Sequence, residues 1–509
     1  MEKRTFLAIV LSIAILIGWQ WLFGPKKRIT STNTPVSAVD DTRKTAKSAL
    51  QSPSIPSASI DLSTKQAKTF QIKTDKAIYV LSENEASIVN CFIKEERLNE
   101  KTSVELVLDG KLLNDRDSGI WSNIPVKNQP YQTKFGRFTS DFYIEKTFCF
   151  SNDSYLIDIK YTILNKTKFP KVFDGLSLAI GPGLGTDAKE MKENKRLLRT
   201  ISYSHKKVEK LKFGGYQFSS KWVGIDNRYF LSVFCQTTDG FKIVISSDVE
   251  KMPLVFTSTS KIEFSPSEKK SFSITSYTGP KGFSRLKGIK IGNTKLQLEK
   301  AVDFGFFGDL GEIALAALNF LYKITHNYGW AIVIISIFLN IVFFPLSKKQ
   351  FASAQAMKSI QNEVKALQIK YKSDPKKMNA EVWSLYKSKG VNPFSGCLPM
   401  LIQLPIFWAL FTMLRNAYEL RGAQWVLWIA DLSTKDPYYV LPVLMGAGMF
   451  LQQWMSTSTA DPTQKQMMIM MPIIFTVMFL GFPSGLVIYW LTNSVVTIIE
   501  QWLIFEKTS

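Results

Sequence analysis

The apolar residues of this chain are gathered into separate blocks, with long polar segments between them. A helix needs about 20 predominantly apolar residues to cross a hydrocarbon core ~30 Å thick. One block lies near the N-terminus and five lie in the C-terminal part, and several of these five are short for a span. We therefore predict six membrane spans, at 6–23, 330–346, 398–414, 439–451, 467–482 and 486–505.

The first block predicts an uncleaved membrane anchor at 1–28. No small-x-small cleavage site follows it, Trp19 and Trp21 suit the headgroup level, and three basic residues follow at the aqueous edge. A cleaved signal peptide is the alternative. Segment 29–66, which contains QSPSIPSAS, has too few apolar residues to offset the entropy of ordering, so it predicts a flexible linker.

Residues 67–300 predict an independently stable domain of many antiparallel strands. Its stretches FYIEKTFCF, SYLIDIKYTIL, FKIVISS and KSFSITSY are rich in β-branched and aromatic residues and alternate in part with period two. Clusters of Asn, Asp, Gly and Lys separate them at short intervals, which is typical of a sandwich or barrel. The next segment, 301–328, contains only about a dozen apolar positions together with Glu312 and Lys323. It predicts an amphipathic helix in the membrane interface.

Lysine sets the predicted orientation. The loop 347–396 carries ten lysines and three acidic residues, whereas the loop 415–438 carries three basic and three acidic residues. Short basic loops stay in the cytoplasm. We therefore place 347–396 and both termini in the cytoplasm and residues 29–328 in the periplasm.

The lysine-rich loop itself predicts an antiparallel helical hairpin. Its apolar residues follow heptad spacing, Ser373-Asp374-Pro375 provides a helix cap, and Gly390 ends the second helix. The seam consists of Met357, Ile360, Val364, Leu367, Tyr371, Met378, Val382 and Leu385. The outward lysines predict contacts with ribosomal RNA or anionic lipid; a solvated connector is the alternative. The contact lysines are Lys358, Lys365, Lys370, Lys376 and Lys377.

Candidate catalytic chemistry is scarce, although the chain has a net charge of +21. The sequence contains no GxxxxGK[ST] motif, and neither of its two histidines lies in a predicted span. His205 stands among lysines, which is typical of a solvated residue. Ser484 in GFPSGL lacks an intramembrane base, so we interpret that stretch as a turn. Cys91, Cys149 and Cys235 lack metal-ligand spacing and permit at most one disulfide among themselves. We predict no enzyme activity, no cofactor, no metal and no small-molecule substrate.

Several specific runs resemble the bacterial YidC membrane protein insertases, and the resemblance covers nearly the whole chain. They are KWVGIDNRYF, SYTGPK, NYGWAIVIIS, FFPLSKKQ, VNPFSGCLPMLIQLPIFWALF, DLSTKDPYYVLPVLMGAGMF and PIIFTVMFLGFPSGLVIYWLTNSVVTIIEQ. The resemblance implies a periplasmic β-supersandwich, an interfacial helix and a five-helix core at 329–509 that includes the hairpin. It implies insertion of nascent membrane proteins into the inner membrane, alone or with the Sec translocon, with the ribosome and membrane lipids as further partners.

Polar residues inside the spans are the candidate lining of a substrate groove. Interhelical hydrogen bonding is the alternative role for such residues. The resemblance implies a groove role for Ser336, Asn340, Gln403 and Trp490, and we add Tyr489 and Asn493 from the last span. A polar groove shortens the path that a hydrophilic segment crosses in lipid, so no nucleotide is required.

The chain departs from the family pattern at two places. Asn340 stands where the family usually carries an arginine, which removes a fixed positive charge from the groove. The chain ends in EKTS without a basic tail, so ribosome docking would use the hairpin and the loop at 460–466. The alternative function is a membrane protein folding or assembly scaffold without translocation of its own. A transporter is less favoured, because no repeat is seen.

Overall fold

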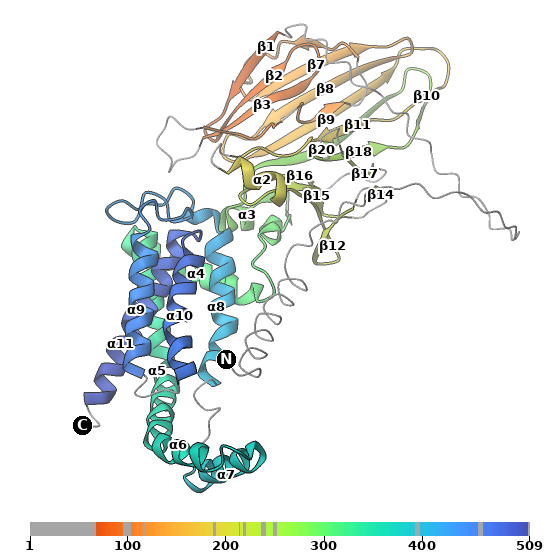
Figure 1. The fold of residues 1–509 in the computed structure, drawn as a ribbon. Coiled ribbons are helices and arrows are strands. Elements are labelled where there is room, and N and C mark those ends of the chain that lie inside the picture. The colour runs from red at the N-terminus through yellow and green to blue at the C-terminus, as the bar shows by residue number, and fades with distance from the viewer. Residues whose placement is uncertain are drawn as a thin grey trace, which may run out of the picture. The chain divides into compact units, whose positions relative to one another are not determined.

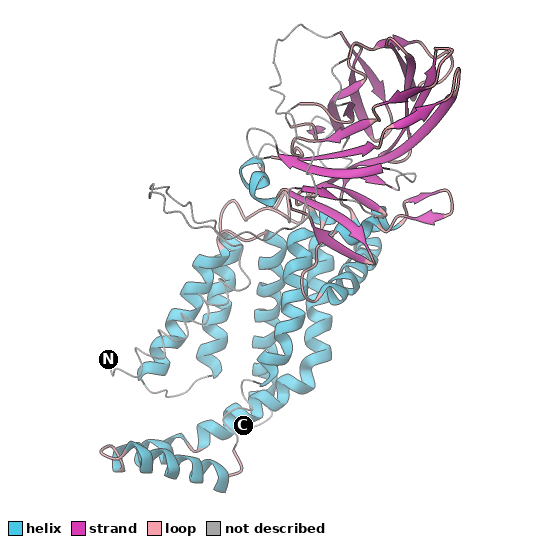
Figure 2. Ribbon diagram, turned by 90° about the vertical axis from the view of Figure 1, so that its right-hand side faces the viewer, coloured by secondary structure: helices cyan, strands magenta, loops and turns pink. Residues whose placement is uncertain are grey.

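The computed structural model describes residues 68–506, apart from gaps at 95–102, 109, 116–118, 187–189, 213, 217–219, 236–240, 248–251, 392–397 and 457–461. The predicted anchor at 1–28 and linker at 29–66 lie outside the described residues, as do residues 457–461 before α10. The described chain contains a β-rich part followed by a helical part (Figure 1, Figure 2).

The β-rich part is organised around one antiparallel sheet of nine strands. Its strands follow the order β13-β12-β15-β16-β20-β9-β8-β7-β6. They are β6 (Ser122–Ile124), β7 (Gln132–Phe138), β8 (Phe142–Phe150), β9 (Leu156–Asn165), β12 (Arg199–Ser204), β13 (Lys207–Lys210), β15 (Trp222–Asp226), β16 (Phe230–Cys235) and β20 (Lys269–Pro280).

Smaller antiparallel sheets complete this part. One has the order β14-β17-β18-β11-β5, another the order β1-β2-β3-β4, and β10-β19 and β21-β22 form pairs. The strands are β1 (Thr69–Lys73), β2 (Ala77–Ser82), β3 (Ser87–Lys94), β4 (Ser103–Glu105), β5 (Asn114–Asp115), β10 (Lys171–Phe173), β11 (Ser177–Ile180), β14 (Gly214–Tyr216), β17 (Phe241–Ser247), β18 (Pro253–Thr259), β19 (Ile262–Phe264), β21 (Lys290–Ile291) and β22 (Thr294–Lys295). β18 packs against β12 and β15, which joins the five-stranded sheet to the nine-stranded one.

The period-two pattern explains why these segments are strands. In β9, Ile157, Ile159 and Tyr161 are buried, whereas the intervening Asp158 and Lys160 are exposed. Side chains of a strand alternate between two faces, so one face of β9 enters the core and the other meets water. All four stretches that the sequence singled out are strands, namely β8, β9, β17 and β20.

In the β-rich part, the histidine lies in a turn and the three cysteines are free thiols. His205 and Lys206 form the two-residue turn between β12 and β13, both with positive φ, and His205 is exposed as predicted. Such a turn matches the twist of the strands it joins. Cys91, Cys149 and Cys235 are all free thiols, so the disulfide that their number permits is not formed among them.

The remaining elements are helices. Short helices α2 (Met191–Leu197), α3 (Phe283–Lys287), η1 (Leu298–Ala301) and η2 (Tyr418–Leu420) lie in connections. The longer ones are α4 (Gly308–Thr325), α5 (Tyr328–Ser359), α6 (Gln361–Lys370), α7 (Pro375–Ser388), α8 (Leu398–Asn416), α9 (Val440–Ser456), α10 (Pro462–Phe479) and α11 (Ser484–Glu506).

The predicted spans after the anchor each fall in a separate helix, α5, α8, α9, α10 or α11. α11 packs against α5, α8 and α9, and α4 packs against α5 and α8 (Figure 1). By length and composition, two described helices are apolar enough to cross a membrane, Tyr328–Met357 and Ser484–Ile504. Val440–Met455 and Met470–Phe479 are shorter apolar stretches. The GFPSGL stretch connects α10 to α11 as a turn, in agreement with the prediction.

The hairpin differs from the prediction at its first helix. α5 continues past Leu346, where the predicted span ends, and stops at Ser359. Ile360 interrupts the helix before α6 begins. Met357 therefore belongs to α5. The break has a local cause, because the Ser359 hydroxyl donates to the Ala356 carbonyl at 2.8 Å and competes with helix continuation.

The rest of the hairpin matches the prediction. The Asp374 carboxylate accepts hydrogen bonds from the backbone amides of Lys376 and Lys377, Pro375 occupies the first turn, and Gly390 has a φ of +64°. The antiparallel pairing of α6 and α7 brings Lys389 to Glu363, with 2.8 Å between Nζ and Oε1. The apolar seam residues of α6 and α7 are half-buried rather than fully enclosed.

Candidate functional site

Two asparagines from distant parts of the sequence form a polar contact inside the helical part. Asn340 of α5 donates from Nδ2 to Oδ1 of Asn493 on α11 at 2.6 Å, and also to the Ser336 carbonyl at 2.8 Å. Both asparagines are half-buried. A carboxamide in an apolar bundle needs such partners, because leaving it unpaired costs several kcal/mol (about 2–7).

The contact extends to two more of the predicted residues. The side chains of Tyr489 and Asn493 are hydrogen-bonded. The buried Ser336 donates from its hydroxyl to the Ile332 carbonyl one turn earlier, at 2.6 Å. Ser336, Asn340, Tyr489 and Asn493 thus form a cluster between α5 and α11, hereafter the polar seam.

Gln403 and Trp490 lie outside this cluster. Gln403 on α8 is exposed, and the partner of Asn340 is Asn493. Trp490 instead packs edge-on against Phe407 and Phe479, with ring centroids 4.9 Å and 5.2 Å apart. Its aromatic surroundings hold α8, α10 and α11 together beside the polar seam.

The polar seam lies where the close packing of the two helices ends. Ala331, Ile332 and Ile335 precede it on α5 and are buried, whereas Phe343 and Leu346, which follow it on the same face, are half-buried. On α11, residues 484–489 are all buried, whereas most residues from 490 onward are half-buried or exposed, with Ser494, Glu500 and Gln501 as buried exceptions. The seam therefore has a closely packed layer on one side and, toward the hairpin end of α5, a less buried region on the other.

The predicted contact lysines differ in their exposure to solvent. Lys370, Lys376 and Lys377 are exposed, and Lys365 is half-buried. Lys370 and Lys377 approach the ring of Tyr371, with Nζ 5.3 Å and 5.4 Å from its centroid. The side chain of Lys358 lies outside what the structure describes. The three exposed lysines present positive charge around the tip of the hairpin.

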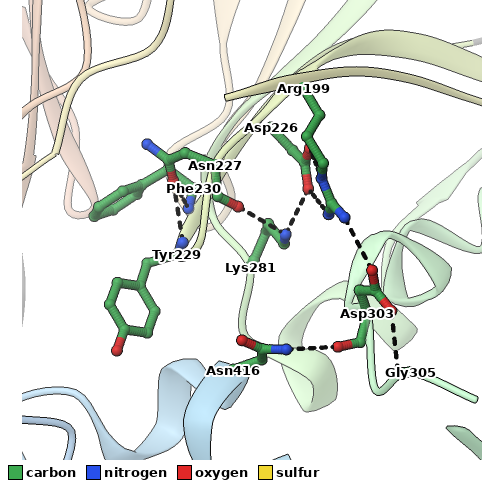
Figure 3. A network of polar contacts seen from close by, with 9 residues as sticks. All are labelled: Arg199, Asp226, Asn227, Tyr229, Phe230, Lys281, Asp303, Gly305 and Asn416. Carbon is green, nitrogen blue, oxygen red and sulfur yellow. Dashed lines mark hydrogen bonds and ion pairs between the residues drawn. The ribbon is translucent and has the colours of Figure 1, made fainter. Parts of the chain in front are cut away.

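A second polar network links the β-rich part to the helical part (Figure 3). The carboxylate of Asp226 accepts from Arg199 and Lys281, each with a contact of 2.6 Å at Oδ2, and both Asp226 and Lys281 are buried. Arg199 also contacts Asp303 at 2.9 Å, and the Asp303 carbonyl accepts from Nδ2 of Asn416 on α8 at 2.8 Å. We call these five residues the boundary network.

The electrostatics of the boundary network favour the charged forms of Arg199 and Asp303, whereas burial works against the charge of Lys281. Burial lowers the pKa of Lys281, and the Asp226 carboxylate opposes that effect. Burial acts against the charge of Arg199 too, but Asp226 outweighs it and raises the pKa of Arg199. For Asp303, burial is outweighed by the Gly305 amide and Arg199, which lower the pKa of the carboxyl. Each buried charge therefore has its counter-charge in place.

In the same region, a carbonyl group at the C-terminal end of α8 accepts hydrogen bonds from a side chain of the β-rich part. Arg228 donates from Nε and Nη2 to the carbonyl of Arg415 at 3.0 Å and 2.6 Å. The last carbonyls of a helix lack intrahelical partners and carry partial negative charge, so a guanidinium stabilises them. This contact places the C-terminal end of α8 beside the turn between β15 and β16.

Sequence reasoning missed both the boundary network and one acidic residue. The network residues Asp226 and Lys281 sit in KWVGIDNRYF and SYTGPK, and those runs had been used only as family markers. Glu500 is the single acidic or basic residue of 484–504, and this was a usable signal. An ionisable side chain in an apolar span indicates a functional position by default.

Comparison with known proteins matches this architecture. The family model described as 60Kd inner membrane protein matches residues 320–509, and that described as YidC periplasmic domain matches 137–313. The membrane protein insertase YidC of Geotalea uraniireducens is 32% identical over 98% of both chains. That of Endomicrobium trichonymphae is 46% identical over 70% of each chain. A crystal structure of an active YidC insertase is 19% identical, with a TM-score of 0.41 over 86% of this chain and 92% of that one.

Proposed function

Because the chain belongs to the YidC family of membrane protein insertases, we propose that it inserts nascent membrane proteins through the polar seam, without nucleotide hydrolysis. As a family member it is an inner-membrane insertase with a mostly β periplasmic domain and a helical C-terminal part. Its clients are nascent membrane proteins. We further propose that it works alone or with the Sec translocon, docks ribosomes and has no enzymatic activity.

The observation that carries the proposal is the Asn340–Asn493 contact and its position. A client's hydrophilic segment loses hydration as it enters lipid, at a cost of several kcal/mol for each polar group left unpaired, about 2–7. The polar seam offers donors and acceptors at the edge of the packed layer, where burial is incomplete. Gln403, exposed on α8, and Trp490 would border the same path.

The driving force would come from the client itself. Its apolar span moves from the water-facing side into lipid, which is favourable in proportion to the apolar area removed from water. α9 has 17 residues, about 26 Å at 1.5 Å per residue, which is less than a typical hydrocarbon core of ~30 Å. Such a short helix would thin the bilayer locally and shorten the polar path.

The proposed topology has six spans, five of them in the core at 329–509, after the anchor at 1–28 and the linker at 29–66. The periplasmic β-supersandwich domain would comprise 67–300, and the interfacial helix 301–328. The Arg228–Arg415 contact supports placing the loop 415–438 on the same side as the β domain. The Asn340–Asn493 contact, together with a Ser347–Glu500 contact seven residues later on both helices, supports parallel α5 and α11. A parallel pair would put the C-terminus on the cytoplasmic side with the hairpin 347–396.

Two surfaces would meet the membrane and the ribosome. α4 buries Leu315 and Leu318 yet exposes Ile313, Phe320 and Ile324, which suits a helix lying against lipid. The exposed hairpin lysines Lys370, Lys376 and Lys377 would contact ribosomal RNA or anionic headgroups.

Reconstitution tests the proposal against the scaffold alternative. The purified full chain would be placed in vesicles without Sec components or nucleotide and given a short single-span client. An insertase makes the client's translocated end resistant to external protease. A scaffold would leave that end accessible while still improving the folding of clients that were inserted beforehand.

A further inference from the structure

One buried acidic side chain lies in the last turns of α11, and no basic residue of the described chain forms an ion pair with it. Glu500 is 7% exposed, and its Oε2 atom is enclosed without a hydrogen-bond partner among the residues that the structure describes. Ser347 on α5 donates a hydrogen bond to the carboxylate. A single hydroxyl is weak compensation for a carboxylate in an apolar bundle, which needs a cation or several donors.

Glu500 continues the polar seam along the same pair of helices. Asn340 pairs with Asn493, and seven positions later on each helix Ser347 pairs with Glu500. Seven residues are about two turns, roughly 10.5 Å along the axis at 1.5 Å per residue. The two contacts therefore lie on one line between parallel helices, and Glu500 is the member nearer the hairpin.

Glu500 is the only residue with a formal charge along this line. Residues 330–347, 439–456 and 484–504 contain no lysine, arginine or aspartate, and their one glutamate is Glu500. A divalent cation is a poor occupant, because no group of three or more His, Cys, Asp or Glu residues gathers for a metal ion in the described ranges. One carboxylate and one hydroxyl beside exposed apolar residues suit a single ammonium or guanidinium on an apolar segment.

We propose that Glu500 and Ser347 form a subsite for a lysine or arginine side chain that flanks the client's transmembrane segment on its cytoplasmic side. The inference rests on the proposed insertase function and names a feature of its clients. Glu500 lies four residues before Ile504, where the apolar stretch ends, which is about 6 Å at 1.5 Å per residue. A client lysine near the interface reaches that depth with its aliphatic stem in lipid.

Three versions of one client test the subsite in vesicles that contain the full chain. They differ only in Lys, Gln or Glu at one position on the cytoplasmic flank of the span, and the initial insertion rates are compared. The wild type should insert the Lys client fastest. Glu500→Gln should lower the ratio of Lys-client to Gln-client rates roughly tenfold, as loss of a charged hydrogen bond predicts. Glu500→Lys should shift the preference to the Glu client.

Matched variants separate recognition from structure. Glu500→Asp keeps the charge and Ser347→Ala keeps the carboxylate, so both should retain a preference for the Lys client. A structural role predicts that Glu500→Gln and Ser347→Ala slow all three clients equally. An unchanged Lys-to-Gln ratio in Glu500→Gln would overturn the subsite, even if the variant is less stable, because the Gln client normalises each preparation. Failure of the wild type to insert any client would instead refute the proposed function.

Discussion

Asn340 of α5 donates a 2.6 Å hydrogen bond to Asn493 of α11, across 153 positions of sequence. The same Nδ2 group also donates to the Ser336 carbonyl, so both of its protons are used within the bundle. The pair joins α5 to α11 and lies where the close packing of these two helices ends. Its role in stability and its role in client contact can be measured separately.

Removing one member of the pair should destabilise the bundle modestly. Asn340→Leu leaves the Asn493 oxygen without its donor, and interhelical hydrogen bonds in membranes contribute about 0.6–1.7 kcal/mol. Thermal unfolding in detergent of Asn340→Leu, Asn493→Leu and the double variant gives the coupling energy. The double variant should be less destabilised than the sum of the single variants. Strict additivity would show that the contact contributes nothing.

Asn340→Arg tests whether water reaches the polar seam. A charge at a dry position within a span costs at least about 2.5–3.5 kcal/mol, whereas a hydrated groove tolerates it. We expect the variant to accumulate at the wild-type level in membranes and to support insertion. The matched control is Ile335→Arg, in the buried layer before the seam, which should be degraded. Degradation of both variants would show that the seam is dry.

The boundary network should make a large contribution to the stability of the β domain. Asp226→Asn leaves Lys281 buried without its counter-charge, and breaking a buried pair in this way costs about 3–5 kcal/mol. Asp174→Asn, which removes a solvent-exposed ion pair with Lys261, should cost at most about 1 kcal/mol. Chemical denaturation followed by tryptophan fluorescence compares the two. Equal midpoints would mean that the network is not a stabilising element.

Charge reversal on the hairpin should weaken ribosome association. Changing Lys370, Lys376 and Lys377 to Glu replaces exposed positive charge with negative charge, and the remaining association should be more sensitive to salt. The control reverses Lys206, Lys207 and Lys210 of the β domain, which changes the net charge equally. Co-sedimentation with ribosomes at several salt concentrations is the measurement. Equal sedimentation of both variants would remove the hairpin from the contact.

Local patterns in the sequence were sufficient to predict secondary-structure elements such as β9 and α7. The alternation in LIDIKYTILN predicts strand β9, and Asp374-Pro375 predicts the start of α7, because both signals act between residues close in sequence. The continuation of α5 to Ser359 was not predicted, since the lysines after Pro345 suggested a loop although lysine favours helix as well.

Pairing between distant elements could not be obtained from those patterns. The partner of Asn340 depends on the relative rotation and register of α5 and α11, and one sequence contains no record of either. Gln403 was a reasonable partner by polarity but is exposed on α8. For the same reason, Asp226 and Lys281 could not be joined before the order of β15, β16 and β20 in the sheet was known.

Site-specific photo-crosslinking tests the central claim most directly, namely that the polar seam contacts the client during insertion. A photoreactive amino acid at 340 is compared with one at 341, the adjacent position that is 63% exposed on the outer surface of α5. A ribosome-stalled client with one partly emerged span should crosslink at 340 and at 493, and much less at 341. Equal crosslinking at 340 and 341, or capture at 341 alone, would contradict the account.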